Sequence, residues 1–211
     1  MSATLILATR NAKKLAELRR ILAPQVEVEV LGLDDVPAFE EVPESGATFA
    51  ENALIKAREA VRHTKLIAVA DDSGLAVDAL NGMPGVLSAR WSGRQAVGPT
   101  GKQPGADEAN LNLVLDQLQD TPDERLGARF VCAAALVTPD GTEIVREAVM
   151  SGRLIREPRG GNGFGYDPIF VPAGYEQTSA ELPPEVKDAI SHRGLALQAL
   201  LPELLTVLGR S

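Results

Sequence analysis

The chain has 211 residues, of which 45% are hydrophobic, enough to bury a sizeable core as one large domain or as two lobes that share a sheet. Its formal net charge of −8 argues against a broad positive surface for nucleic acid, so an anionic ligand must be met by a local group of Lys and Arg. No apolar run approaches the roughly 20 residues of a membrane span and the start "MSATLILATRN" lacks a signal-peptide pattern, which predicts a cytoplasmic protein without membrane or nucleic-acid partners.

The N-terminal part predicts a strand followed by two helices. Residues 3–9, "ATLILAT", are an apolar run typical of a strand, and residues 11–22, "NAKKLAELRRIL", have a helical pattern with Asn11 as a natural N-cap. A second helix is predicted to begin at Thr48, because Thr48 and Glu51 have the spacing of a capping box. Glu51 is therefore interpreted as a structural residue.

The stretch "LIAVADDSG" raises the main chemical question. Residues 66–70 predict a short apolar strand that ends at an acidic turn beginning with Asp71 and Asp72, and "LAVDAL" after the turn predicts another extended piece. Adjacent carboxylates at the end of a buried strand repel each other and are costly to desolvate, so they shift their pKa values or find a cation. A hard divalent ion such as Mg²⁺ would resolve the conflict. An exposed turn capped by Asp72 or Ser73 is the structural alternative.

The rest of the chain alternates loops, strands and helices. Residues 92–106 are rich in Gly and Pro and predict a loop, after which Asp107 is positioned to cap a helix. Residues 128–155 predict two antiparallel strands joined by a turn at "PDG". A strand is expected at 167–172 and helical structure at 184–208. The alternation of helices and strands predicts an α/β fold with a mixed sheet.

A candidate phosphate site lies in "TRNAKK", residues 9–14, where a strand ends and a helix begins. Unpaired backbone N–H groups and the positive end of the helix dipole meet at such a place, and both attract phosphate. Hydroxyl, amide and basic side chains that suit the same ligand accompany them: Thr9, Arg10, Asn11, Lys13 and Lys14. A capped helix with solvated lysines in its first turn explains the same residues, although these lysines oppose the helix dipole.

Two further stretches carry polar groups beside helix starts. Glu44, in "PESG", offers a third carboxylate for a metal site, or is an ordinary exposed glutamate. In "SHRG", Ser191 is positioned as an N-cap, and His192 and Arg193 follow in the first turn. Basic groups there are unfavourable against the helix dipole unless an anionic or polar ligand lies nearby.

Taken together, six motifs resemble the inosine triphosphate pyrophosphatase family, which cleaves non-standard purine nucleoside triphosphates such as XTP, ITP and dITP to monophosphates. The match runs essentially from Thr4 to Leu208 and rests on these motifs, in order: "TRNAKK", "ESGATFAENALIKA", "ADDSGLAVDAL", "PGVLSARW", "GFGYDPIF" and "AISHRGLAL". Each motif alone is weak, but the ordered set is highly specific. The resemblance implies one domain over 1–211, an elongated two-lobed α/β protein with a long curved mixed β-sheet flanked by helices, an active-site cleft between the lobes, and a homodimer.

The resemblance also assigns roles to residues. It implies that Asp72 binds Mg²⁺ and accepts a proton from the attacking water, that Glu44 is a second metal ligand, and that Asp71 is an auxiliary metal or structural carboxylate. The implied triphosphate cradle is Thr9, Arg10, Asn11, Ala12, Lys13 and Lys14. The remaining implied substrate contacts are Ser73, Phe164, Gly165, Tyr166, Asp167, Lys187, His192 and Arg193, with Lys56 as a weaker phosphate contact.

The resemblance also bears on how the purine base is recognised, and the chain differs from the family pattern in two places. A 6-keto purine presents an acceptor where adenine presents a donor, so donors from Arg193, His192 or loop N–H groups would favour it, and Phe164 could stack on the base. Family members commonly have Gly where this chain has Arg10, and the loop 94–106 is longer than usual, with no role assigned to it. A nucleotide-binding regulator without hydrolysis and a plain globular domain are the alternatives.

Overall fold

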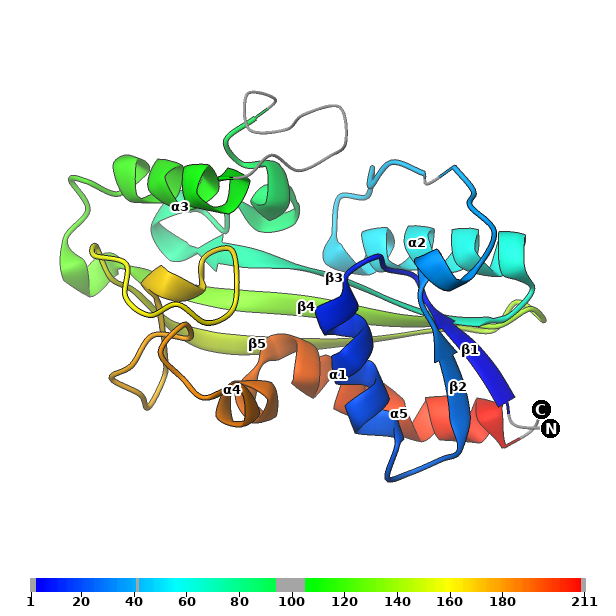
Figure 1. Cartoon of the computed structure of the whole chain (residues 1–211). Helices are drawn as coiled ribbons and strands as arrows, with labels where there is room; N and C mark the ends of the chain where they lie inside the picture. The colour runs from blue at the N-terminus through cyan, green and yellow to red at the C-terminus, as the bar shows by residue number, and fades with distance from the viewer. Residues whose placement is uncertain (1–2, 41, 94–104, 210–211) are drawn as a thin grey trace. The chain divides into compact units, whose positions relative to one another are not determined.

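The computed structural model describes residues 3–40, 42–93 and 105–209, and Figure 1 shows the course of the chain. The chain divides into two compact units. The first consists of Met1–Asp72, Cys132–Ala148 and His192–Ser211, and the second of Ser73–Val131 and Val149–Ser191. Strands β3, β4 and β5 each contribute residues to both units. The expectation of a single domain over 1–211 stays a prediction.

The sheet is mixed, as predicted. Its strands lie in the order β2-β1-β3-β4-β5-β6, with the bounds β1 Ala3–Leu7, β2 Val28–Leu31, β3 Ile67–Val77, β4 Gly127–Val137, β5 Glu143–Leu154 and β6 Phe170–Pro172. β1 pairs in parallel with both β2 and β3, whereas β5 and β6 are antiparallel. β4 and β5 are neighbours joined by a short turn in which the Thr138 N–H donates to Thr142 O at 3.0 Å. A parallel crossover needs a dozen residues or more, so this pair is antiparallel as predicted.

Five α-helices are described: α1 Ala12–Leu22, α2 Phe49–Thr64, α3 Ala106–Gln117, α4 Pro184–Ile190 and α5 His192–Leu208. The pattern at 184–208 thus forms two helices, separated at Ser191, whose backbone is extended. The strand expected at 167–172 is shorter than predicted, because Asp167–Ile169 form a 3-10 turn before β6. None of the helices described here combines the length and hydropathy needed to cross a membrane.

Strand residues of the first unit alternate between two hydrophobic clusters. Leu5, Leu7 and Val69 pack in a cluster with α1 and α5 residues such as Leu18 and Leu200. Ile6, Ala68 and Ala70 pack instead with three alanines of α2, namely Ala53, Ala57 and Ala60. Because successive side chains of a strand point to opposite faces, α1 and α5 cover one face of this part of the sheet and α2 covers the other (Figure 1).

β3 runs without a break from Ile67 to Val77, so the turn predicted after Ala70 is wrong. Asp71 continues the alternation on the α1 and α5 face, and Asp72 continues it on the α2 face. The two residues are only 4% and 8% exposed. The prediction failed because it assumed that adjacent charges must leave the sheet, whereas side chains from three helices meet them inside it.

The second unit has a core of its own, to which α3 contributes Leu111 and Val114, together with its C-cap residue Leu118. The prediction that Asp107 caps α3 is wrong. The N-cap is Gly105, whose φ of 95° suits glycine, and Asp107 lies inside the first turn. Its carboxylate is engaged elsewhere, since Asp107 Oδ2 accepts from the Gly165 N–H at 3.0 Å. Residues 94–104 of the long loop lie outside the described residues.

Candidate active site

Asp71 is held between two cations that come from different helices. Lys14 of α1 donates from Nζ to Asp71 Oδ2 at 2.7 Å, and Arg193 of α5 donates from Nε to the same oxygen at 3.1 Å. The Arg193 guanidinium also lies 3.7 Å from the carboxylate of Glu17. The fold thus gathers three residues of the predicted site on the face covered by α1 and α5.

Asp72 lies on the other face, among groups of α2 and the loop before it. Lys56 Nζ is 3.0 Å from Asp72 Oδ1 and 2.9 Å from Glu44 Oε1, so one ammonium group joins both carboxylates. Asn52 Nδ2 donates to the other oxygen, Asp72 Oδ2, at 3.1 Å. Glu44, Lys56 and Asp72, far apart in sequence, therefore form one cluster.

Burial and charge shift the pKa values of these groups in different directions. Burial acts to raise the pKa of Asp71, but the charges of Lys14, Arg193 and Lys56 outweigh it and hold that pKa far below its usual range. Burial raises the pKa of Asp72, Lys56 lowers it and Glu44 raises it again, with a net upward shift. Burial, together with the charges of Arg193 and Lys56, lowers the pKa of Lys14, and Asp71 only partly offsets this shift. Asp71 is therefore the permanent anion, and Asp72 is the carboxylate better suited to accept a proton.

The start of α1 is arranged as the sequence predicted. Asn11 caps the helix, since its Oδ1 accepts from the Lys14 N–H at 3.4 Å. The Asn11 N–H donates in turn to Thr9 Oγ1 at 3.1 Å. These bonds fix the turn between β1 and α1 beside the carboxyl ends of parallel strands, where open α/β sheets bind their ligands.

Three other residues of the same loop differ in the groups that they could present to a phosphate. Arg10 is exposed and pairs with Asp34 at 2.5 Å, so its side chain faces a neighbouring carboxylate. Ala12 is exposed and opens α1, which leaves its backbone N–H at the helix start. The side chain of Lys13 lies outside the described residues.

Asp167 and Lys187 form a close ion pair in the second unit. Lys187 Nζ lies 2.5 Å from Asp167 Oδ2, which also accepts from the Phe164 N–H at 2.9 Å. A Cβ at Gly163 would come within 2.1 Å of that oxygen, so only glycine fits there. Phe164 is 42% exposed, and Lys187 Nζ lies 5.8 Å from its ring centre. The loop thus exposes the apolar ring of Phe164 to solvent, while Asp167 and Lys187 hold its backbone in place.

Tyr166 anchors the same loop. Its hydroxyl donates to Ser88 O at 2.8 Å, and burial together with the nearby Asp107 charge raises its pKa. Tyr166 is 4% exposed, so its side chain supports the loop while its neighbour Phe164 is accessible. Ser73, also of the second unit, is partly buried in β3. His192, of the first unit, is 9% exposed at the start of α5.

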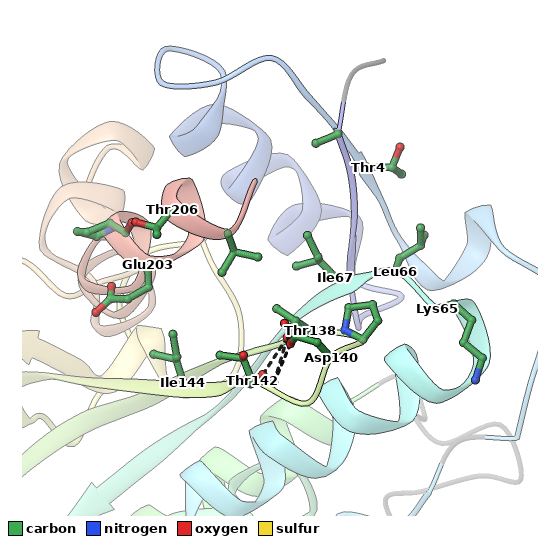
Figure 2. A pocket seen from close by; sticks show the side chains of 14 residues that line it. Thr4, Lys65, Leu66, Ile67, Thr138, Asp140, Thr142, Ile144, Glu203 and Thr206 are labelled. Carbon is green, nitrogen blue, oxygen red and sulfur yellow. Dashed lines mark hydrogen bonds between the residues drawn. The ribbon is translucent and has the colours of Figure 1, made fainter. Parts of the chain in front are cut away.

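Two hollows lie in the first unit. One, of about 150 Å³, is bordered by Glu44 and Lys56 together with Ala8, Leu33, Phe39, Val42 and Glu59. The other, of about 680 Å³, is seen in Figure 2 and is lined by the starts of β1 and β3, the β4–β5 turn and the last turns of α5. The larger hollow is at the amino ends of β1 and β3, whereas Thr9 and Asp72 are at or beyond their paired carboxyl ends. Size alone therefore does not locate the candidate site.

The residues around Lys56 suit a divalent cation chemically. Glu44 and Asp72 supply hard oxygen donors that converge on one positive group. Burial first, and then the Glu44 charge, raise the pKa of Asp72, so a cation bound beside it would offset part of the cost of burying this carboxylate. In the described part of the chain, no three His, Cys, Asp or Glu side chains are grouped as ready metal ligands. The protein donor set that fits is thus the pair Glu44 and Asp72. Asp71 faces its two cations instead, and its role as an auxiliary ligand stays a prediction.

A model of the Ham1 family matches residues 5–203. The chain belongs to the Ham1 family. It is 61% identical over 211 residues to the dITP/XTP pyrophosphatase of Mycobacteroides abscessus, with 98% of each chain covered. It is 58% identical over 211 residues to the dITP/XTP pyrophosphatase of Nocardia farcinica, with 99% of this chain and 98% of that one covered. The family membership predicted from the six motifs is confirmed.

Solved Ham1 structures support the fold as well. The HAM1 protein from Coxiella burnetii is 40% identical and superposes with a TM-score of 0.82, covering 99% of this chain and 100% of that one. The α/β architecture with a mixed sheet flanked by helices is therefore confirmed as a Ham1 fold.

Two buried polar residues that contact the candidate site were not predicted from the sequence. Asn52 is fully buried against Asp72, and Glu17 is 8% exposed beside Arg193. Helical spacing could have signalled Asn52, which precedes Lys56 by one turn and borders the apolar stripe of α2. Glu17 gave no such signal, because its partner is distant in sequence.

Proposed function

We propose that the protein hydrolyses non-standard purine nucleoside triphosphates, such as dITP, XTP and ITP, to the monophosphate and pyrophosphate. The observation that carries this proposal is the convergence of Glu44 and Asp72 on one ammonium group, in a chain whose relatives are named dITP/XTP pyrophosphatases. Two carboxylates with a raised pKa at one of them suit a site that binds a cation and accepts a proton.

Glu44 and Asp72 would hold the cofactor, which we propose is Mg²⁺. Carboxylate oxygens are its preferred protein ligands, and its remaining positions commonly take water and substrate phosphates. When bound, Mg²⁺ would supply positive charge to the triphosphate oxygens. Lys56, which pairs with both carboxylates in this structure, would then be available to the phosphates.

The residues of the site divide the reaction between them. Asp72 accepts a proton from the water whose oxygen attacks the α-phosphorus, and the raised pKa of Asp72 favours that transfer. The bond from the α-phosphorus to its bridging oxygen breaks, and pyrophosphate leaves. Lys14 and the N–H groups at the start of α1 bind the polyphosphate. The lowered pKa of Lys14 means that this ammonium gains from a further anion beside it.

Base choice is assigned to separate groups. Arg193 and His192, at the start of α5, supply donors that match the 6-keto oxygen of hypoxanthine or xanthine and leave adenine unmatched. The exposed ring of Phe164 offers a stacking surface, and its loop is held by Asp167, with Lys187 bound to the same carboxylate. Ser73, Gly165 and Tyr166 complete the proposed substrate contacts.

Pyrophosphate release from dITP, XTP and dATP in the presence of Mg²⁺ tests the proposal. We expect dIMP from dITP and far less product from dATP, and an Asp72→Asn variant that is folded but at least about 100-fold slower, as for loss of a general base. Asp123→Asn is the matched control, because this aspartate is exposed and pairs only with Arg156 among the contacts described. Tight dITP binding without turnover would favour the non-hydrolysing regulator.

The proposal also includes the remaining expectations from the family resemblance. A nucleotide-pool enzyme works where nucleotides are made and used, so we expect a cytoplasmic protein. We further expect a homodimer, which light scattering of the purified protein would test: a monomer mass at working concentration would contradict it.

A further inference from the structure

The side chain of Asn52 connects the two carboxylate segments of the candidate metal site. Asn52 is 0% exposed in α2. Its Oδ1 accepts from the Gly46 N–H at 2.8 Å, and its Nδ2 donates to Asp72 Oδ2 at 3.1 Å. Gly46 belongs to the loop that carries Glu44 two residues earlier, so one amide group spans the Glu44 loop and Asp72.

Both contacts require an amide at this position. An amide offers a donor and an acceptor, whereas an aliphatic side chain would leave the Gly46 N–H and the buried Asp72 oxygen without these partners. The loop is also fitted to the amide, because a Cβ on Gly46 would lie 2.8 Å from Asn52 Oδ1 and 2.7 Å from Glu51 Cβ. Asparagine is a mediocre helix former, so helix propensity does not account for its presence in α2.

We propose that Asn52 is a positioning residue that fixes Glu44 and Asp72 relative to each other and thereby sets the affinity of the site for a divalent cation. This inference rests on the proposed function. The side chain of Asn52 is occupied by the Gly46 N–H and Asp72, so it acts through the two carboxylates. Groups that orient metal ligands in this way commonly change metal affinity by about 10–100-fold when they are removed.

Glu51 provides a matched control in the same helix. Its Oε2 accepts from the Ala47 N–H at 2.7 Å, so Glu51 also tethers the loop before α2, but it has no recorded contact with Asp72. If loop tethering alone matters, Glu51→Ala and Asn52→Ala should behave alike. If Asn52 acts by pairing the two carboxylates, only Asn52→Ala should weaken the metal site.

Binding of Mn²⁺ alone, followed by electron paramagnetic resonance, tests the inference without reference to turnover. We expect the Kd for Mn²⁺ to rise about tenfold or more in Asn52→Ala, and to stay within about twofold of wild type in Glu51→Ala. The Mg²⁺ concentration for half-maximal dITP hydrolysis should rise in parallel, while circular dichroism shows both variants to be folded.

Equal Mn²⁺ affinity in wild type and Asn52→Ala, or an equal loss in Glu51→Ala, would overturn the inference. If Asn52→Ala does not fold, Gly46→Ala perturbs the same contact from the loop side, and an unchanged Mn²⁺ affinity there would overturn it too. A wild-type protein that binds no Mn²⁺ also sinks the inference, whereas the proposed function is judged independently by pyrophosphate release from dITP.

Discussion

At the scale of single residues, Asp71 and Asp72 remain charged inside a strand because each meets different partners. Asp71 is balanced by Lys14 and Arg193 on one face, and Asp72 by Lys56 on the other. A charge removed from water is tolerated only with such compensation. The pairing also leaves the two aspartates chemically distinct, since the pKa of Asp71 is depressed and that of Asp72 is raised.

Removal of Lys56 should lower the stability of the protein, because two carboxylates would remain close together without a cation between them. Lys56→Met leaves Glu44 and Asp72 without their shared cation, and we expect the free energy of unfolding in urea to fall by about 2 kcal/mol in metal-free buffer. Arg58→Met is the control in the same helix, because the Arg58–Glu143 pair is exposed and its loss should cost under about 1 kcal/mol. Equal losses in the two variants would show that Lys56 does not neutralise the site.

Tyr166 should make the free energy of unfolding decrease at alkaline pH. Its folded pKa is raised by burial and by Asp107, so the folded state keeps the phenol proton at a pH where the unfolded chain, with a tyrosine pKa of about 10, has lost it. Stability must then fall as pH rises above about 10. In Tyr175→Phe, where Tyr166 is the remaining tyrosine, we expect no tyrosinate absorbance at 295 nm near pH 10.5 until urea is added. Ordinary titration of the native variant would contradict the buried hydroxyl.

At the scale of elements, residues 160–165 form a glycine-rich loop in which Gly163 is approached closely by the Asp167–Lys187 pair. A Cβ at Gly163 would meet Asp167 Oδ2 and Lys187 Nζ, and its φ of +79° is unfavourable for other residues. Gly163→Ala should therefore displace Phe164 and raise the KM for dITP about tenfold, with a smaller change in kcat. Gly161→Ala is the matched control, because nothing lies within 4 Å of the added carbon. If KM is unchanged in Gly163→Ala, the loop does not contribute to substrate binding.

The elements also show how far sequence could lead. Helical periodicity and the capping box identified α1 and α2 because these signals are local, and Glu51 N does donate to Thr48 Oγ1. The course of β3 through Asp71 and Asp72 could not be read from local sequence, since the cations that allow it come from residues as distant as Arg193. The prediction that Asp107 caps α3 was wrong for the same reason, because its hydrogen-bond partner Gly165 is remote in sequence.

At the scale of the whole molecule, an acidic chain reaches an anionic substrate by concentrating its cations. The net charge is −8, yet Lys14, Lys56 and Arg193 converge around Asp71 and Asp72. The same side chains also face Glu44 and Glu17, so these cations are held in place by carboxylates at one site rather than spread over the surface. The six motifs predicted the family because they carry these residues, but they did not reveal which cation serves which carboxylate.

The shift in Tm that a bound nucleotide causes measures the selectivity of the whole protein for the purine base. A ligand that binds only the folded state stabilises it by about 2.7 kcal/mol at 100 times its Kd. We expect a non-hydrolysable dITP analogue with Mg²⁺ to raise the Tm of the wild-type protein, and the equivalent dATP analogue to raise it much less, because adenine lacks the 6-keto acceptor. Asp72→Asn should lose most of the Mg²⁺-dependent part of the shift while keeping a Tm of its own in ligand-free buffer. Equal shifts with both analogues would mean that base choice is made after binding, in the chemical step, and not by donors at the start of α5.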